Sequence, residues 1–225
     1  ETGKKVYEGH LKMGKRHGNG TEYFDNGRIS CQGEWREGKL DGHVKTYHRN
    51  GRVAHQGVCR QGSLDGHGTI YHNETGKKVY EGHFKMGKKD GNGTQYHDNG
   101  RIKVQGKWTE DMFDGHVKMY HRNGKIAYQG VCRGSHGHGT HYHHETGKKV
   151  YEGHLKMGKR HGNGTEYFDN GRIFCQGEWR EGKLDGHVKE YHRSGKIAYQ
   201  GVCRGPHAHG TQYHHETGKK VYEGH

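Results

Sequence analysis

The stretch Val6 to Gly27, VYEGHLKMGKRHGNGTEYFDNG, decides how this chain folds. It holds five glycines, two tyrosines and one leucine, too few apolar side chains to fill a globular core. In VYEGHL, alternation places Tyr7 and Leu11 on one side of an extended chain and Glu8 on the other. We therefore expect a strand here, a turn at Gly14 and a second strand over GNGTEYF.

The tripeptide Asp25-Asn26-Gly27 closes this second strand. Asn-Gly is a strong hairpin signal because both residues tolerate positive φ. The dipeptide recurs at 50–51, 99–100, 123–124 and 170–171. The pattern predicts that one hairpin follows another along the chain.

The same pattern returns at intervals of 23 to 25 residues along the whole sequence. It is marked by one glycine in each repeat: Gly9, Gly33, Gly57, Gly82, Gly106, Gly130, Gly153, Gly177, Gly201 and Gly224. Three repeats form a longer unit of about 71 residues, and residues 1–60 and 145–204 differ at only six positions. We predict one array over 1–225 with about nine repeats, in units 1–73, 74–144 and 145–215 and the start of a fourth at 216–225.

Composition excludes two other fold classes. Only 27% of the residues are hydrophobic and 42 of the 225 are glycine, whereas a globular domain is nearly half apolar. A disordered chain is also excluded, because 15 tyrosines, 3 tryptophans and 5 phenylalanines recur at fixed places in the repeat.

Two columns of side chains are expected to form a thin structural spine. Two residues after each marker glycine stand Leu11, Trp35, Cys59, Phe84, Trp108, Cys132, Leu155, Trp179 and Cys203. Twelve or fourteen residues after it stand Tyr23, Tyr47, Tyr71, Tyr96, Tyr120, Tyr142, Tyr167, Tyr191 and Tyr213. Glycines such as Gly18 and Gly20 would let large rings lie against a neighbouring backbone.

The run Tyr7 to Leu11 with Gly14, Gly18 and Gly20, echoed by CQGEWREGKLDG over 31–42, resembles the MORN (membrane occupation and recognition nexus) repeat. Another residue replaces a motif glycine at four positions: Val44, Val117, Val188 and Ala208. The resemblance covers the full length and implies an all-β fold, an elongated antiparallel array with one hairpin per repeat. It implies a role as a scaffold, a dimerisation rod or a membrane-proximal adaptor.

Histidine is the first candidate for site chemistry, since the chain has 25 of them and carries the run HGHGTHYHH over 136–144. Alternate histidines on a strand share a face and can bind zinc, copper or nickel, so His136, His138, His141 and His143 are candidate ligands. No cysteine or carboxylate joins them at metal spacing. We therefore interpret them as solvated residues and predict neither a metal nor another cofactor.

The five cysteines are expected to be free, buried thiols. Cys59, Cys132 and Cys203 belong to the first spine column, and Cys31 and Cys175 replace a tyrosine two residues before the marker glycine. Their odd number and their wide spacing argue against a framework of disulfides.

The charge balance is strongly basic, with a formal net charge of +13 and a pI near 9.4. We expect basic edges, with Lys12, Lys15 and Arg16 at one and Lys4, Lys5 and Arg28 towards the other. Acidic residues are interleaved with these cations and no nucleic-acid-binding module is present, so nucleic acid is an improbable partner. Anionic lipid headgroups remain compatible with such edges.

No nucleophile triad, catalytic carboxylate pair or phosphate-binding loop stands out, so we predict that the protein is not an enzyme. Near-identical units favour a structural protein that makes the same contact many times, as a rod that assembles with itself into a fibre or scaffold. The decapeptide ETGKKVYEGH begins at residues 1, 74, 145 and 216, so we expect the array to extend end to end. The alternative is an adaptor that binds membrane headgroups or other proteins through its basic edges.

The sequence is compatible with more than one cellular compartment. An extracellular filament, a cytoskeletal sheath and a virus particle are all compatible with the sequence. The Asn-x-Thr sequons at Asn19, Asn73, Asn92 and Asn163 would carry glycans only in a secreted protein.

Overall fold

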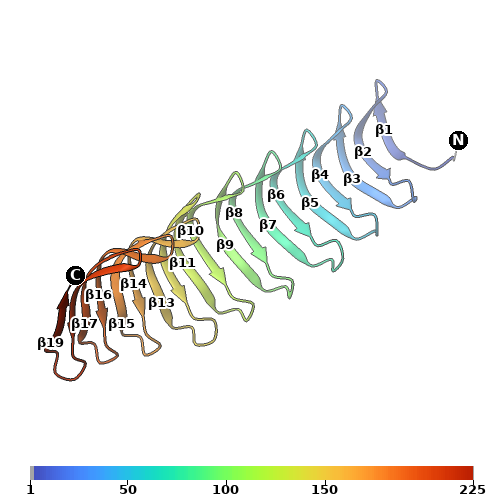
Figure 1. Cartoon of the computed structure of the whole chain (residues 1–225). Coiled ribbons are helices and arrows are strands. Elements are labelled where there is room, and N and C mark those ends of the chain that lie inside the picture. Colours follow the sequence, from blue (N-terminus) through green and yellow to red (C-terminus); the bar gives the residue numbers. More distant parts are fainter. Residues whose placement is uncertain (1–2, 225) are drawn as a thin grey trace. The chain divides into compact units, whose positions relative to one another are not determined.

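The computed structural model describes residues 3–224, and within them it contains nineteen β-strands and no helix (Figure 1). The predicted all-β class is confirmed. Since these residues form no helix, none of them belongs to a helix that could span a membrane. The chain divides into two compact units, Glu1–Phe113 and Asp114–His225, each of which is described by itself.

The strands of the first unit alternate with short turns. They are β1 (Tyr7–Lys12), β2 (Lys15–Tyr23), β3 (Ile29–Arg36), β4 (Lys39–Tyr47), β5 (Val53–Arg60), β6 (Ser63–Tyr71), β7 (Lys78–Lys85), β8 (Lys88–Tyr96) and β9 (Ile102–Thr109).

The second unit continues the alternation. Its strands are β10 (Met112–Tyr120), which begins just before the division, β11 (Ile126–Arg133), β12 (His136–Tyr142), β13 (Lys149–Lys156), β14 (Lys159–Tyr167), β15 (Ile173–Arg180), β16 (Lys183–Tyr191), β17 (Ile197–Arg204), β18 (His207–Tyr213) and β19 (Lys220–Gly224).

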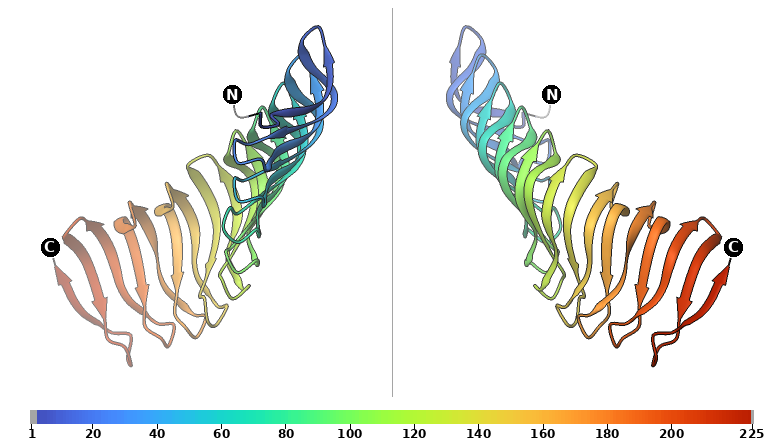
Figure 2. Two further views of the ribbon diagram at one scale, coloured as in Figure 1. Left: turned by 90° about the vertical axis from the view of Figure 1, so that its right-hand side faces the viewer. Right: turned by 90° about the vertical axis from the view of Figure 1, so that its left-hand side faces the viewer.

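Within each unit, every strand pairs antiparallel with the next one in sequence (Figure 2). Motif glycines face each other across these pairs, as Gly9 faces Gly20 and Gly153 faces Gly164. The predicted array of antiparallel hairpins is therefore confirmed in each unit.

Two kinds of turn join the strands. At the first, Met13 (φ 50°) and Gly14 (φ 73°) both have positive φ, which is the type I′ geometry of a two-residue hairpin. At the second, the backbone N–H of Gly27 donates to the carbonyl of Phe24 at 2.9 Å, and only the glycine has positive φ. Asn26 therefore does not adopt the positive φ that it could tolerate. The Asn26 side chain instead accepts the N–H of Arg28 at 3.0 Å.

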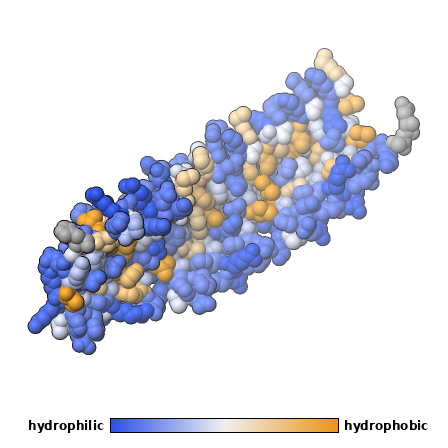
Figure 3. Space-filling model, viewed as in Figure 1, coloured by the Kyte–Doolittle hydropathy of each residue, from blue (hydrophilic) through white to orange (hydrophobic). Residues whose placement is uncertain are grey.

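The pairing gives the sheet two chemically different faces. Because paired residues point to the same side, Tyr7, Glu22 and Cys31 share one face with Trp35, and we call it the tryptophan face. The opposite face, here called the groove face, carries the residues between them, beginning with Glu8, Thr21, Gln32, Lys45 and Gln56. In Figure 3 hydrophobic residues gather along the middle of the strands, with hydrophilic residues at both edges.

The core lies on the tryptophan face, and its most buried tyrosines stand two residues before the marker glycine. Tyr80 is 0% exposed and Tyr151 is 1% exposed. A Cβ added at Gly93 would lie 2.0 Å from Tyr80 Oη, so only glycine leaves room for the ring. In the first repeat, the ring of Tyr7 meets that of Trp35 edge-on at 5.7 Å.

The first spine column also lies on the tryptophan face. Six of its members are buried: Trp35, Cys59, Phe84, Trp108, Cys132 and Trp179. Leu155 and Cys203 are half-buried. Leu11 is 63% exposed, which contradicts its placement in the spine, because β1 has a neighbouring strand on one side only.

The tyrosine column at the ends of the second strands does not belong to the same spine. Tyr23 follows Glu22 directly, so strand alternation turns it to the groove face, where its hydroxyl donates to Glu8 at 2.9 Å. Tyr47 donates in the same way to Gln32 at 2.9 Å. All nine are half-buried: Tyr23, Tyr47, Tyr71, Tyr96, Tyr120, Tyr142, Tyr167, Tyr191 and Tyr213. The interpretation of the two columns as one spine is therefore wrong.

Candidate binding grooves

A break in strand register shapes the groove face. Between β3 and β4, Gly33 faces Val44 but Trp35 faces Leu40, so β4 carries two extra residues. The extra residues free the backbone N–H of His43, and Glu34 Oε1 accepts it at 3.2 Å. The second unit repeats this arrangement, with the N–H of His187 donating to Glu178 at 3.2 Å.

A groove lies on this face in each unit. The groove of the first unit, about 620 Å³, crosses β3 to β7, and that of the second unit, about 410 Å³, crosses β14 to β17. Seven residues of the first groove are Gln32, Gly33, His43, Val44, Lys45, Gln56 and Gly57. The same seven types line the second groove, each 144 positions later: Gln176, Gly177, His187, Val188, Lys189, Gln200 and Gly201.

The groove walls suit a polar, extended partner. Gln32 and Gln56 flank Lys45, to which both are paired across the sheet. Their amides donate and accept hydrogen bonds, and the lysine adds a positive charge. Glycines in the floor bring the backbone itself within reach of a bound chain.

The four candidate metal ligands do not come together. His138 points to the groove face, whereas His141 points to the tryptophan face between two tyrosine rings, and burial lowers the pKa of His141. His143 Nδ1 accepts the backbone N–H groups of Glu145 and Thr146, both at 3.3 Å, and His136 is exposed. Among residues 3–224, no group of three or more histidine, cysteine or acidic side chains is placed to hold a metal ion.

The five cysteines are free, four of them buried and Cys203 half-buried. Burial, together with the hydrogen bond to Glu22, raises the pKa of Cys31 to about 12. Burial likewise raises the pKa of Cys175 to about 12. At neutral pH these thiols are therefore protonated and weakly nucleophilic.

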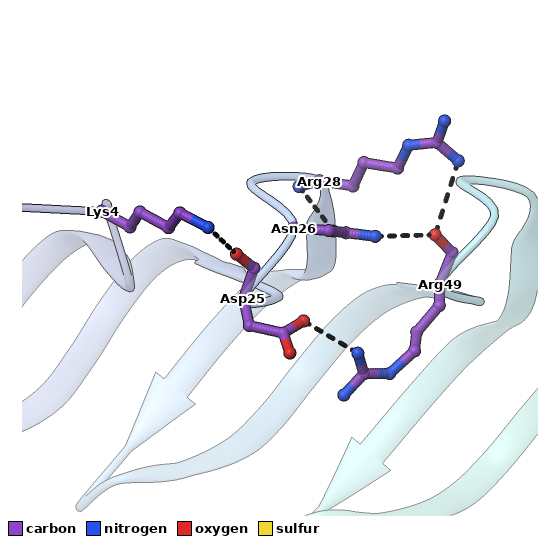
Figure 4. A network of polar contacts seen from close by, with 5 residues as sticks. All are labelled: Lys4, Asp25, Asn26, Arg28 and Arg49. Carbon is purple, nitrogen blue, oxygen red and sulfur yellow. Dashed lines mark hydrogen bonds and ion pairs between the residues drawn. The ribbon is translucent and has the colours of Figure 1, made fainter. Parts of the chain in front are cut away.

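The longer loops form an edge whose cations are largely engaged. Figure 4 shows Lys4 donating to the carbonyl of Asp25 at 3.0 Å and the Asp25 carboxylate paired with Arg49 at 2.8 Å. The side chains of Asn26 and Arg28 both donate to the Arg49 carbonyl. These cations tie one loop to the next, which is a structural use of the charge.

The opposite edge, formed by the two-residue turns, differs from the prediction at Arg16. Its guanidinium lies over Tyr7 and Trp35, at 4.8 and 4.7 Å from the ring centroids, and pairs with Glu22 at 2.6 Å. Arg16 thus covers the core instead of facing a partner. Lys12 and Lys15 are exposed and form no ion pair with a described residue.

Sequence reasoning missed the grooves. The available signal was a third column, in which the residue before each marker glycine is Glu or Gln in every repeat from Glu8 to Glu223. That column points to the groove face, and its polarity marks the open face of the sheet.

Comparison with known families agrees with this architecture. The model described as MORN repeat matches residues 7–27, 31–43, 80–101 and 151–171. The model described as MORN repeat variant matches 113–131 and 184–202, two middle repeats in which valine replaces the motif glycine. No curated protein gives a significant match. The two models together cover just over half of the chain, and it therefore belongs to the MORN-repeat proteins.

Proposed function

We propose that this chain is a non-catalytic structural scaffold that makes one contact many times and so assembles with its own copies into a fibre or larger framework. One observation carries the proposal: the two grooves are lined by the same seven residue types at positions 144 apart. A site for one ligand needs a single copy, whereas an assembly needs the same contact at regular intervals.

The chain also presents a complementary element for such a contact. The turns Glu37–Gly38 and Glu181–Gly182 lie 144 positions apart and hold exposed carboxylates at their tips. Each carboxylate complements the lysine of a groove, Lys45 or Lys189, on another copy.

The test uses two matched charge reversals. Lys45→Glu with Lys189→Glu changes the grooves, and Lys12→Glu with Lys156→Glu changes two exposed turn positions with the same spacing. Sedimentation velocity and electron microscopy at rising protein concentration should show assembly of the wild type and of the turn variant, and its loss in the groove variant. A wild type that stays monomeric throughout would contradict the proposal.

A second function, a membrane-headgroup or protein adaptor, is favoured by the first turn of each sequence unit. Met13 is 94% exposed and both Met86 and Met157 are 78% exposed. A lysine lies on either side of each turn, as Lys12 and Lys15 flank Met13-Gly14. An apolar tip between cations fits the boundary between anionic headgroups and acyl chains.

The same variants separate the two functions. Co-sedimentation with phosphatidylserine vesicles should be lost in the Lys12→Glu, Lys156→Glu variant if the adaptor is correct, and binding should weaken as salt rises. The groove variant would then bind vesicles like the wild type.

A further inference from the structure

Among residues 3–224, two rows of the groove face place one histidine directly opposite another. His67 on β6 faces His83 on β7, and His138 on β12 faces His154 on β13. All four side chains are exposed. The pairs occupy equivalent positions, 71 residues apart in sequence, and each lies within one unit.

The ring separations suit a shared metal ion. Two imidazoles that bind one ion at about 2.0–2.1 Å, with an angle of about 90–110° between them, have ring centroids roughly 4.5–5.2 Å apart. The centroids are 4.6 Å apart in the pair His138–His154 and 5.6 Å apart in the pair His67–His83. The separation in the pair His138–His154 lies within this range, whereas the rings of His67 and His83 must come closer by rotation about their side-chain bonds.

The hydrogen bonding of His154 leaves the correct nitrogen available. His154 Nδ1 lies 3.3 Å from the backbone carbonyl oxygen of Asn163. A carbonyl can only accept, so Nδ1 carries the hydrogen and Nε2 keeps its lone pair. Metal-binding histidines typically donate their second ring nitrogen to such an oxygen, which fixes the ring and its tautomer.

A carboxylate next to each pair reduces the charge penalty for a cation. Glu81 faces Thr69, two residues along from the pair His67–His83, and Glu152 stands in the same relation to His138–His154. Each carboxylate is paired with a lysine three residues before it, Glu81 with Lys78 at 2.8 Å and Glu152 with Lys149 at 2.9 Å.

We propose that His67 with His83, and His138 with His154, form two equivalent surface sites for a divalent transition-metal ion that prefers imidazole, such as Ni²⁺, Cu²⁺ or Zn²⁺. Each ion is held by two Nε2 atoms, and water completes its coordination. His67 also lines the groove of the first unit, so the first pair borders the proposed scaffold contact, but metal binding does not require self-assembly.

The chain supplies its own matched controls. His43, His116 and His187 occupy the same position in their repeats and are equally exposed, but each faces a valine. They provide the metal affinity of a single histidine at this position that has no second histidine across the sheet.

The experiment is a titration of the protein, free of any histidine tag, with Ni²⁺ at neutral pH in isothermal calorimetry. We expect the pairs His67–His83 and His138–His154 each to bind about tenfold or more tightly than single histidines, because the second imidazole binds intramolecularly. His154→Ala should remove one tight site and His83→Ala with His154→Ala should remove both. His116→Ala with His187→Ala should keep both.

A spectroscopic readout tests the ligands themselves. With Cu²⁺, electron paramagnetic resonance should show two coupled imidazole nitrogens in the wild type, and these should be lost in the double variant His83→Ala, His154→Ala. Retention of both tight sites in that variant would overturn the proposal, as would their loss in the His116→Ala, His187→Ala control. Circular dichroism checks folding, and His67→Ala with His138→Ala provides a second removal of both pairs.

Discussion

Two clusters at equivalent positions of the repeat cover the same kind of aromatic pair in different ways. In the second unit, the Arg160 guanidinium lies 4.8 and 4.7 Å from the ring centroids of Tyr151 and Trp179 and donates two hydrogen bonds of 2.9 Å to Glu166. In the first unit, the place of this arginine is taken by Lys89, whose ammonium lies 5.0 and 4.6 Å from the equivalent rings.

The partner of the cation changes together with the cation. Gln95 stands where Glu166 stands in the other cluster, and Val104 stands where Cys175 does. An arginine and a carboxylate form a two-point ion pair, whereas a lysine is a point charge on a flexible stem. The cluster with the lysine thus has no buried carboxylate that depends on a bidentate partner. In these two clusters the ion pair is therefore either complete or absent.

The two tryptophans differ in how their indole N–H is satisfied. Trp179 Nε1 donates to the carbonyl of Gly164 at 3.4 Å, a long hydrogen bond. Trp108 Nε1 is buried and has no hydrogen-bond partner among the described residues, and the Phe113 ring packs against Trp108 at 4.3 Å. Ring packing compensates for a polar group that is left unpaired.

The largest expected effect on stability comes from the buried tryptophan that both clusters contain. Trp108→Ala and Trp179→Ala should each lower the local free energy of unfolding by about 3–5 kcal/mol, because each removes a large buried ring. Hydrogen exchange of the neighbouring strand amides measures this. His116→Ala, on the exposed face, should cost less than about 0.5 kcal/mol. Equal effects of the three changes would show that the core is not on the tryptophan face.

The ion pair gives the next effect in size. Glu166→Gln leaves the partly covered Arg160 without its carboxylate and should destabilise by about 1–2 kcal/mol. Gln95→Glu supplies Lys89 with a partner and should stabilise by up to about 1 kcal/mol. Urea denaturation measures both. Destabilisation by Gln95→Glu would mean that desolvation of the new carboxylate outweighs the pairing.

The indole N–H gives a smaller difference. Trp108→Phe removes an unpaired buried donor, whereas Trp179→Phe removes a donor that has a partner. The first change should therefore cost about 1 kcal/mol less than the second, beyond their shared loss of ring area. Thermal denaturation of the two variants side by side measures this difference in stability. Identical shifts in the melting temperature would contradict the prediction.

The smallest effect is a pH dependence. Burial lowers the pKa of Lys89, Lys103 lowers it further and Asp111 partly opposes the shift. A lowered pKa means that the charged form is disfavoured in the folded state, so the penalty is present at neutral pH and disappears as the pH rises through the folded pKa towards about 10.4. Relative to Lys89→Gln, the wild type should therefore gain stability between pH 8 and pH 10.5. Arg160→Gln should show no such trend against the wild type, because arginine stays charged.

The sequence predicted the hairpins well because their signals are local. Glycine spacing and strand alternation are visible within a single repeat, and Gly14 and Gly27 mark the turns that join the strands. The prediction that the tyrosine column belongs to the core was wrong because a fixed position in the repeat does not reveal the face of the sheet to which a side chain points. Tyr23 lies one residue beyond Glu22 and points to the opposite face. The grooves and the histidine pairs depend on which residues meet across strands. The register break after Gly33 sets that relation for the first groove, and no single strand encodes it.

The edge-on contact of Tyr7 with Trp35 has a consequence for how such a chain changes in length. The contact recurs as Tyr80 with Trp108 and as Tyr151 with Trp179, always between the first and second repeats of a sequence unit. Loss of one second repeat would set the tyrosine against the cysteine of the third. Recombination between misaligned copies of the coding sequence therefore preserves every core contact only when it adds or removes three repeats at a time. Variants of the gene should differ in steps of about 71 codons.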